Sequence, residues 1–187
     1  SDLFDKLFVF VELEIFLQLV AALKDETLAV TNRTDPFDTG VYIEAKTPQL
    51  YRDSFNISVE DLIVAKLRKT GWWPPSPTRR VRFQSFDPAA IDRFVELTGA
   101  EARRSMVQMI DTRMLPLLNK GTVANQSSES YGTTSWDLIF NRLAERVGGV
   151  SVDKTMLTAN LSLADHIIKE ARARSLFMHV WTFSALE

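Results

Sequence analysis

The chain has 187 residues, which is enough for one domain with a substantial hydrophobic core. Its hydrophobic share of 45% and charged share of 25% are ordinary for a globular protein, and its formal net charge is −2. This balance gives no electrostatic reason to expect nucleic acid or an acidic membrane surface as a partner. The absence of cysteine excludes disulfides, thiolate metal sites and a catalytic thiol, and it leaves the compartment undetermined.

The N-terminal segment contains an apolar run, 7–11, that is soon interrupted by Glu12 and Glu14. A membrane-spanning helix needs about 20 mostly apolar residues, and a signal peptide needs a basic leader. The sequence has neither feature here, so we expect no transmembrane segment.

The first half of the chain alternates between helix and strand patterns. Apolar residues at helical spacing predict a helix over about 12–24, and the polar stretch 25–39 is typical of a loop. A β-branched and aromatic run predicts a strand over 40–46, followed by a helix over about 59–70 that Ser58 would cap. A second strand is expected over 81–86, and Asp87 followed by Pro88 predicts the start of a helix that extends to about residue 98.

The second half continues the alternation. The short apolar run 106–110 is compatible with a third strand, and the stretch 120–134 is typical of a long loop. Ser135 would cap a helix that Gly148 and Gly149 end, another helix is expected over 160–174, and the last strand over 176–183. This order predicts an α/β fold in which parallel strands are connected by crossover helices.

Charged residues lie near the end of the first predicted strand. Because side chains alternate along a strand, Tyr42, Glu44 and Lys46 share one face. The carboxyl ends of parallel strands hold the active site in α/β barrels, so Glu44 could ligate a divalent cation and Lys46 could neutralise a phosphate oxygen. A solvent-facing ion pair explains the same spacing, and both interpretations remain open.

The last predicted strand places Phe177, His179 and Trp181 on one face. Trp181 could form the wall of a ligand pocket or simply belong to the core, and His179 is most simply a hydrogen-bonded core residue. His166 falls within a predicted helix and is interpreted as a surface or packing residue.

Four segments, taken in chain order, resemble the glycerophosphodiester phosphodiesterase family. The first matches the family's strand with a Glu-x-Lys-x-Pro pattern, the second its Gln-Ser-Phe-Asp strand end, the third a loop after a strand, and the fourth its His-x-Trp-Thr ending. The four segments are GVYIEAKTP at 40–48, FQSFDP at 83–88, VDK at 152–154 and ARARSLFMHVWT at 171–182. Together they are ordered and spaced as in the family over residues 40–182.

The resemblance implies a TIM-type barrel that hydrolyses glycerophosphodiesters to glycerol 3-phosphate and an alcohol, with Ca²⁺ or Mg²⁺ as the cofactor. By match, Glu44 corresponds to the family's metal-ligand glutamate and Lys46 to the lysine that contacts phosphate. Trp181 corresponds to the pocket tryptophan, and Gln84 is a further candidate for substrate binding. The implied partner is therefore a small-molecule glycerophosphodiester that is processed in lipid metabolism.

The sequence departs from the family in ways that bear on activity. The family begins with a His-Arg-Gly strand, a Glu-x-Asp pair and a His-Asp pair, and no histidine precedes Glu44 here. Arg172 and Ser175 stand where the family has histidine and glycine. A full barrel takes about 250 residues. We therefore expect residues 1–187 to form a single, incomplete TIM-type (β/α) barrel domain with no catalytic residue assigned.

Three interpretations of that expectation remain open. The chain is a fragment or truncated form of a metal-dependent phosphoric diester hydrolase, which leaves its status as an enzyme uncertain. Alternatively it is a non-catalytic structural or interaction subunit derived from that family. In the third, a partner chain completes the barrel. The sequence identifies neither the alcohol headgroup, the metal, nor the localisation.

Overall fold

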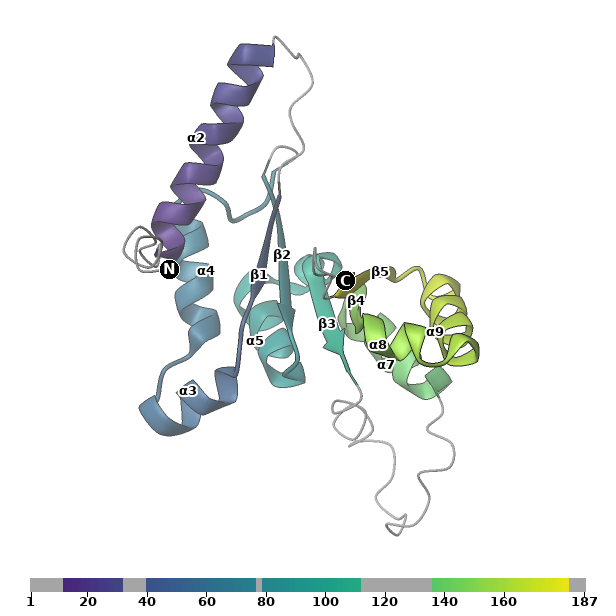
Figure 1. Cartoon of the computed structure of the whole chain (residues 1–187). Coiled ribbons are helices and arrows are strands. Elements are labelled where there is room, and N and C mark those ends of the chain that lie inside the picture. The colour runs from purple at the N-terminus through teal and green to yellow at the C-terminus, as the bar shows by residue number, and fades with distance from the viewer. Residues whose placement is uncertain (1–11, 32–39, 77–78, 112–135, 182–187) are drawn as a thin grey trace, which may run out of the picture. The chain divides into compact units, whose positions relative to one another are not determined.

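The computed structural model describes residues 12–31, 40–76, 79–111 and 136–181 (Figure 1). Helices alternate with strands along the chain, as the sequence predicts. The elements are α2 (Leu13–Thr31), β1 (Gly40–Glu44), α3 (Pro48–Phe55), α4 (Val59–Lys69), β2 (Arg80–Ser85), α5 (Pro88–Thr98), the 3-10 helix η1 (Ala100–Ser105), β3 (Met106–Ile110), α7 (Trp136–Arg146), β4 (Gly149–Asp153), α8 (Lys154–Thr158), α9 (Leu161–Ala173) and β5 (Phe177–Trp181). The described residues divide between two compact units.

The first unit comprises residues up to Val41 together with Asp61–Val81, and its main elements are α2 and most of α4. The start of α2 lies beside the end of α4, where Lys66 pairs with Glu14 (Figure 1). The indole of Trp72 is fully buried and donates a hydrogen bond to the carbonyl of Leu17, which is itself fully buried. The bond satisfies the indole N–H, so burying the large ring leaves no polar group unpaired.

Helix α2 is longer than its sequence pattern predicts. The expected loop over 25–39 is wrong for 25–31, because the helix continues to Thr31. This stretch contains no glycine or proline, so nothing in it breaks a helix. The rest of the expected loop, 32–39, lies outside the described residues, as does the expected loop over 120–134.

The second unit comprises Tyr42–Glu60 and the chain from Arg82 onward, and it carries the sheet apart from the first two residues of β1 and β2. The strand order β1-β2-β3-β4-β5 follows the sequence. The five strands are parallel, with register pairs such as Phe83↔Met106 and Ser151↔His179. The prediction that the first, second and last strands are parallel members of one sheet is confirmed.

Strand β4 and the short helices α3 and α8 are absent from the sequence-based expectations. The segment at 152–154 was expected to be a loop, but β4 includes Asp153 and α8 begins at the next residue. Gly148 and Gly149 were interpreted only as the end of a helix, and the strand that begins at Gly149 was therefore not predicted. Gly149 has a packing reason to be glycine, since a Cβ there would lie 2.4 Å from the ring of Phe177 on β5.

The sheet is strongly curled. In a flat sheet, strands β1 and β5 would lie about 19 Å apart, because neighbouring strands are about 4.8 Å apart. Instead, the rings of Tyr42 on β1 and His179 on β5 have centroids 5.2 Å apart. The two outer strands therefore face each other across the concave side, and the sheet forms half of a barrel.

Helices cover the opposite, convex face. Phe83 of β2 is fully buried against Phe94 of α5, with ring centroids 4.6 Å apart. Helix α9 packs against β5 and α8, and α7 packs against α9 (Figure 1). The prediction that helices near 88–98 and 161–174 pack on the sheet therefore holds, while most of α4 belongs to the first unit.

Candidate functional site

The carboxyl end of β1 carries the first group of predicted site residues. Glu44 is the last residue of the strand, and the side-chain amide of Gln84 on β2 donates to its carboxylate at 3.5 Å, a long hydrogen bond. Lys46 follows two residues beyond Glu44 and is exposed. The hydrogen bond from the Ala45 amide to the Gln84 carbonyl continues the pairing of the strands past Glu44. Glu44 and Gln84 are therefore neighbours on the concave face.

Trp181 ends β5 at the same edge of the sheet. Its indole N–H donates to the carbonyl of Ser151 at 3.1 Å, and its ring meets the edge of Phe86, with centroids 5.3 Å apart. Phe86 directly follows β2, so Trp181 leans across the concave face toward the strand that carries Gln84. Because parallel strands share their carboxyl ends, Glu44, Gln84 and Trp181 lie along one edge of the half-barrel.

Two further carboxylates occupy this edge and were not singled out from sequence. Asp153 ends β4, and its side chain caps α8 by accepting from the amide and hydroxyl of Thr155, each at 2.8 Å. Asp111 directly follows β3 and is buried, with 4% of its surface exposed. Its position one residue beyond an apolar strand is the signal that would have found it, since that is where barrel sites gather polar groups.

Below this edge lies a layer of rings. The Nδ1 atom of His179 is 3.1 Å from the hydroxyl of Tyr42, and Phe177 packs against the same imidazole at 5.1 Å. The guanidinium of Arg82 lies over Phe177, 3.8 Å from the ring centroid. The shared face of the three β5 residues is as predicted. His179 is hydrogen-bonded as expected but exposed on the concave face, so the interpretation as a core residue is wrong.

This layer keeps both titratable rings neutral. Partial burial, assisted by the positive charge of Arg82, lowers the pKa of His179 below its ordinary value. Burial raises the pKa of Tyr42 to about 12, and Arg82 opposes that shift only in part. At neutral pH the pair is therefore a neutral imidazole hydrogen-bonded to a protonated phenol.

The surroundings of Glu44 do not fit a calcium or magnesium site. Both ions prefer about six oxygen ligands. Within the described part of the chain, Glu44 belongs to no group of three carboxylate or imidazole donors close enough to share an ion, and one of its oxygens already accepts from Gln84. Water would have to supply nearly all the remaining ligands.

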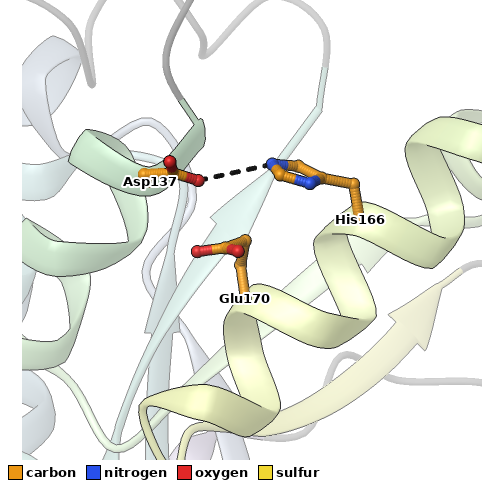
Figure 2. Close-up of side chains that lie close together, drawn as sticks. All are labelled: Asp137, His166 and Glu170. Atoms are coloured by element: carbon orange, nitrogen blue, oxygen red, sulfur yellow. Dashed lines mark ion pairs between the residues drawn. The ribbon is translucent and has the colours of Figure 1, made fainter.

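The one such group of donors found among the described residues lies on the helical face (Figure 2). Asp137 extends from α7 toward His166 on α9, with 3.5 Å between carboxylate and imidazole, and Glu170 lies one turn further along α9. Nitrogen and oxygen donors of this kind suit zinc. However, Arg174 pairs with Glu170 and bonds to the Asp137 carbonyl, so the group already links α7 to α9 as an ion-pair network. His166 is a surface residue, as expected, with this carboxylate partner.

No protein-family model matches the chain, and no curated protein matches it. Among the helices of the described segments, none combines the length and hydrophobicity needed to cross a bilayer.

Proposed function

We propose that this chain is a glycerophosphodiester phosphodiesterase-like domain, derived from a TIM-type barrel, that does not hydrolyse glycerophosphodiesters by itself. The observation that carries the proposal is the common edge formed by Glu44, Gln84 and Trp181. They come from three of the four segments that resemble the family, and the carboxyl edge of the strands is where α/β barrels build their sites.

The chemistry at this edge suits a phosphodiester ligand. An exposed ammonium such as that of Lys46 offers a mobile cation with three donors for phosphate oxygens. Trp181 offers an apolar wall with its indole N–H already satisfied by Ser151, so the ring face remains for the glycerol or headgroup carbons. Gln84 orients Glu44 through its amide.

General acid–base catalysis is the step that this edge does not support. It contributes about 10²–10⁴-fold to rate and requires a proton donor or acceptor beside the reacting atoms. The chain has two histidines. His179 is engaged with Tyr42 in the ring layer, and His166 with Asp137 on the helical face. Among the contacts of the described residues, neither histidine meets Glu44, so this edge favours binding over turnover.

A non-catalytic structural or interaction subunit derived from the same family is the alternative. It is favoured by the donor set around Glu44, which does not fit the divalent cation that hydrolysis in the family needs. The completion of the barrel by a partner chain is a third proposal. The structural subunit differs from the first proposal in that the carboxyl edge with Glu44 would no longer recognise a ligand.

Calorimetric titration of the purified chain with glycerol 3-phosphate distinguishes them. We expect saturable binding that Lys46→Gln weakens about tenfold, the effect of losing one charge-assisted contact. Lys69→Gln, on the first unit, serves as the matched control and should leave the affinity unchanged. If the unaltered chain fails to bind at millimolar concentration, the ligand-recognising edge is refuted and the structural subunit is favoured.

A further inference from the structure

Helices α7 and α9 of the convex face bring three side chains together that are common metal ligands. Asp137 lies in the first turn of α7, and His166 and Glu170 come from α9 (Figure 2). Because His166 and Glu170 are four residues apart, both lie on the same face of their helix. One ligand atom from each of the three residues lies within 4.8 Å of the other two. We call Asp137, His166 and Glu170 the α7–α9 cluster.

The distance between imidazole and carboxylate suits a shared ion better than a direct hydrogen bond. Nε2 of His166 and Oδ1 of Asp137 are 3.5 Å apart. An N–H···O hydrogen bond is shorter, at about 2.7–3.2 Å. Ligand atoms that each lie about 2.0–2.2 Å from a tetrahedral zinc ion are about 3.4 Å from one another. The two atoms are therefore spaced as neighbouring zinc ligands are, and the flexible side chain of Glu170 can close the remaining distance.

The ion pair of Glu170 leaves part of its carboxylate available. Arg174 donates through Nη1 to Oε2 of Glu170. Within the described part of the chain, the structure gives the other carboxylate oxygen of Glu170 no partner. Carboxylates that bind a metal are in turn held by hydrogen bonds from neighbouring groups. Arg174 therefore orients Glu170 for a ligand without occupying both of its oxygens.

The charge around the α7–α9 cluster favours a cation. Two carboxylates, those of Asp137 and Glu170, stand against the single guanidinium of Arg174, which also donates to the carbonyl of Asp137. The neighbouring ammonium of Lys169 is engaged with Asp165 at 2.7 Å. The fixed charge of the cluster and its guanidinium is therefore negative, and a divalent cation is attracted to it.

The donor types select among the divalent cations. An imidazole nitrogen with two carboxylates is a ligand set that zinc accepts, and three protein ligands leave one position of its tetrahedron for water. The partial exposure of the cluster gives water access to that position. Calcium and magnesium prefer about six oxygen ligands, which the cluster does not supply.

We propose that the α7–α9 cluster binds a zinc ion, with Asp137, His166 and Glu170 as ligands and Arg174 as the residue that orients Glu170. The ion ties the first turn of α7 to α9, and it stabilises the folded chain because it binds the folded form preferentially. The site contains none of the residues of the carboxyl edge, so it does not depend on the function proposed above.

The test is calorimetric titration of the purified chain, without an affinity tag, with zinc chloride and with magnesium chloride. We expect one zinc ion to bind saturably at micromolar concentration, and magnesium to bind far more weakly. His166→Gln and Asp137→Asn should each weaken zinc by at least about tenfold, since even groups that only orient a ligand contribute about 10–100-fold. Neither side chain is buried, so both variants are expected to fold, which circular dichroism checks.

Asp165→Asn is the matched control, since Asp165 precedes His166 on α9 and pairs with Lys169 outside the cluster. It should leave the zinc affinity unchanged. The chain has only two histidines, so NMR spectra of the imidazoles locate the ion directly. Zinc should shift the resonances of His166 and leave those of His179 in place.

Four results would overturn the proposal. They are the absence of saturable zinc binding below millimolar concentration, equal affinity for magnesium, equal weakening by Asp165→Asn and Asp137→Asn, and a shift of His179 in place of His166.

Discussion

The state of His179 depends on its position among Tyr42, Phe177 and the charge of Arg82. Burial and the guanidinium lower the pKa of His179, so removal of the charge by Arg82→Gln should raise it toward the ordinary value of 6.5. An NMR titration of the imidazole protons measures this directly, with His166 as the internal reference. An unchanged pKa of His179 in the variant would contradict the geometry of the ring layer.

The same shift has a consequence for stability. Because the folded-state pKa of His179 is below its unfolded value, the unfolded chain binds the proton more readily. The stabilising contribution is present above about pH 6.5 and is lost as the pH falls from there through the folded-state pKa. Urea unfolding should show that His179→Gln loses less stability than the unaltered chain over this window. Parallel curves for the two proteins would be the contrary result.

Ser175 occupies a position where glycine would be easier. Its φ of 56° is in the left-handed region, which costs a residue with a Cβ about 1–2 kcal/mol. We expect Ser175→Gly to increase the free energy of unfolding by about 0.5–1 kcal/mol, after the greater backbone entropy of glycine is subtracted. Ser105→Gly, where φ is not positive, should instead destabilise the protein. Denaturant unfolding compares the two variants. A loss of stability in Ser175→Gly would contradict the claim that the backbone of Ser175 is strained.

The face of the sheet on which a side chain lies was predictable from sequence, because side chains alternate along a strand. The shared face of Phe177, His179 and Trp181 follows from the two-residue period alone. The exposure of His179 does not, because it depends on how far the sheet curls. Asp111 was missed because it is a single polar residue after an apolar run, without any motif around it.

Among the elements, α3, the start of α4 and α5 are joined by Arg52. Its guanidinium pairs with Glu60, whose side chain is completely buried, and with Asp87 at 2.6 Å. Asp87 also caps α5 through the Ala89 amide. Ser58 contributes a second hydrogen bond to Glu60. The Arg52 side chain therefore pairs both with the buried carboxylate of Glu60 and with Asp87, the residue that caps α5.

Replacing Arg52 should accordingly be costly. Arg52→Ala leaves Glu60 buried without its charge partner, and we expect a loss of about 3 kcal/mol in the free energy of unfolding. Arg93→Ala, which breaks an exposed pair with Glu96, should change stability by about 0.5 kcal/mol or less. Urea denaturation measures both. Similar values for the two variants would show that the buried pair has no special role.

The stability contributed by the ion pairs between α2 and α4 should depend on pH. Hydrogen bonds from Lys66 and Lys69 lower the pKa of Glu14 below 4.5, so its contribution is present above that pH and is lost as the pH falls through the folded-state value. Glu14→Gln should therefore destabilise the protein at pH 6 and have progressively less effect below pH 4.5. Glu26→Gln, on the same helix, is the control. A stability difference for Glu14→Gln that does not change with pH would contradict the ion pairs.

Elements were predictable from sequence where the periodicity was strong and the caps were clear. Asp87 and Pro88 define the start of α5 as expected. The end of α2 was not predictable from polarity, because charged residues are compatible with an exposed helix. Strand β4 was missed because Gly149, its first residue, looks like part of a helix end but packs the sheet against Phe177.

At the scale of the whole molecule, element order predicts the parallel sheet, since parallel strands need crossover connections and those connections are helices here. The curl into half of a barrel could not be predicted from element order, because an open twisted sheet has the same alternation of elements. It is the contact between Tyr42 and His179 that distinguishes the two.

The central claim is that this half-barrel carries the family's ligand-facing edge without the groups for turnover. The most direct measurement is the release of glycerol 3-phosphate from glycerophosphocholine by the purified chain, with Ca²⁺ or Mg²⁺ added. We predict no release above the rate in buffer, because neither histidine lies beside Glu44 and the donors around Glu44 do not fit the metal. Turnover that is abolished by Glu44→Gln would contradict the claim.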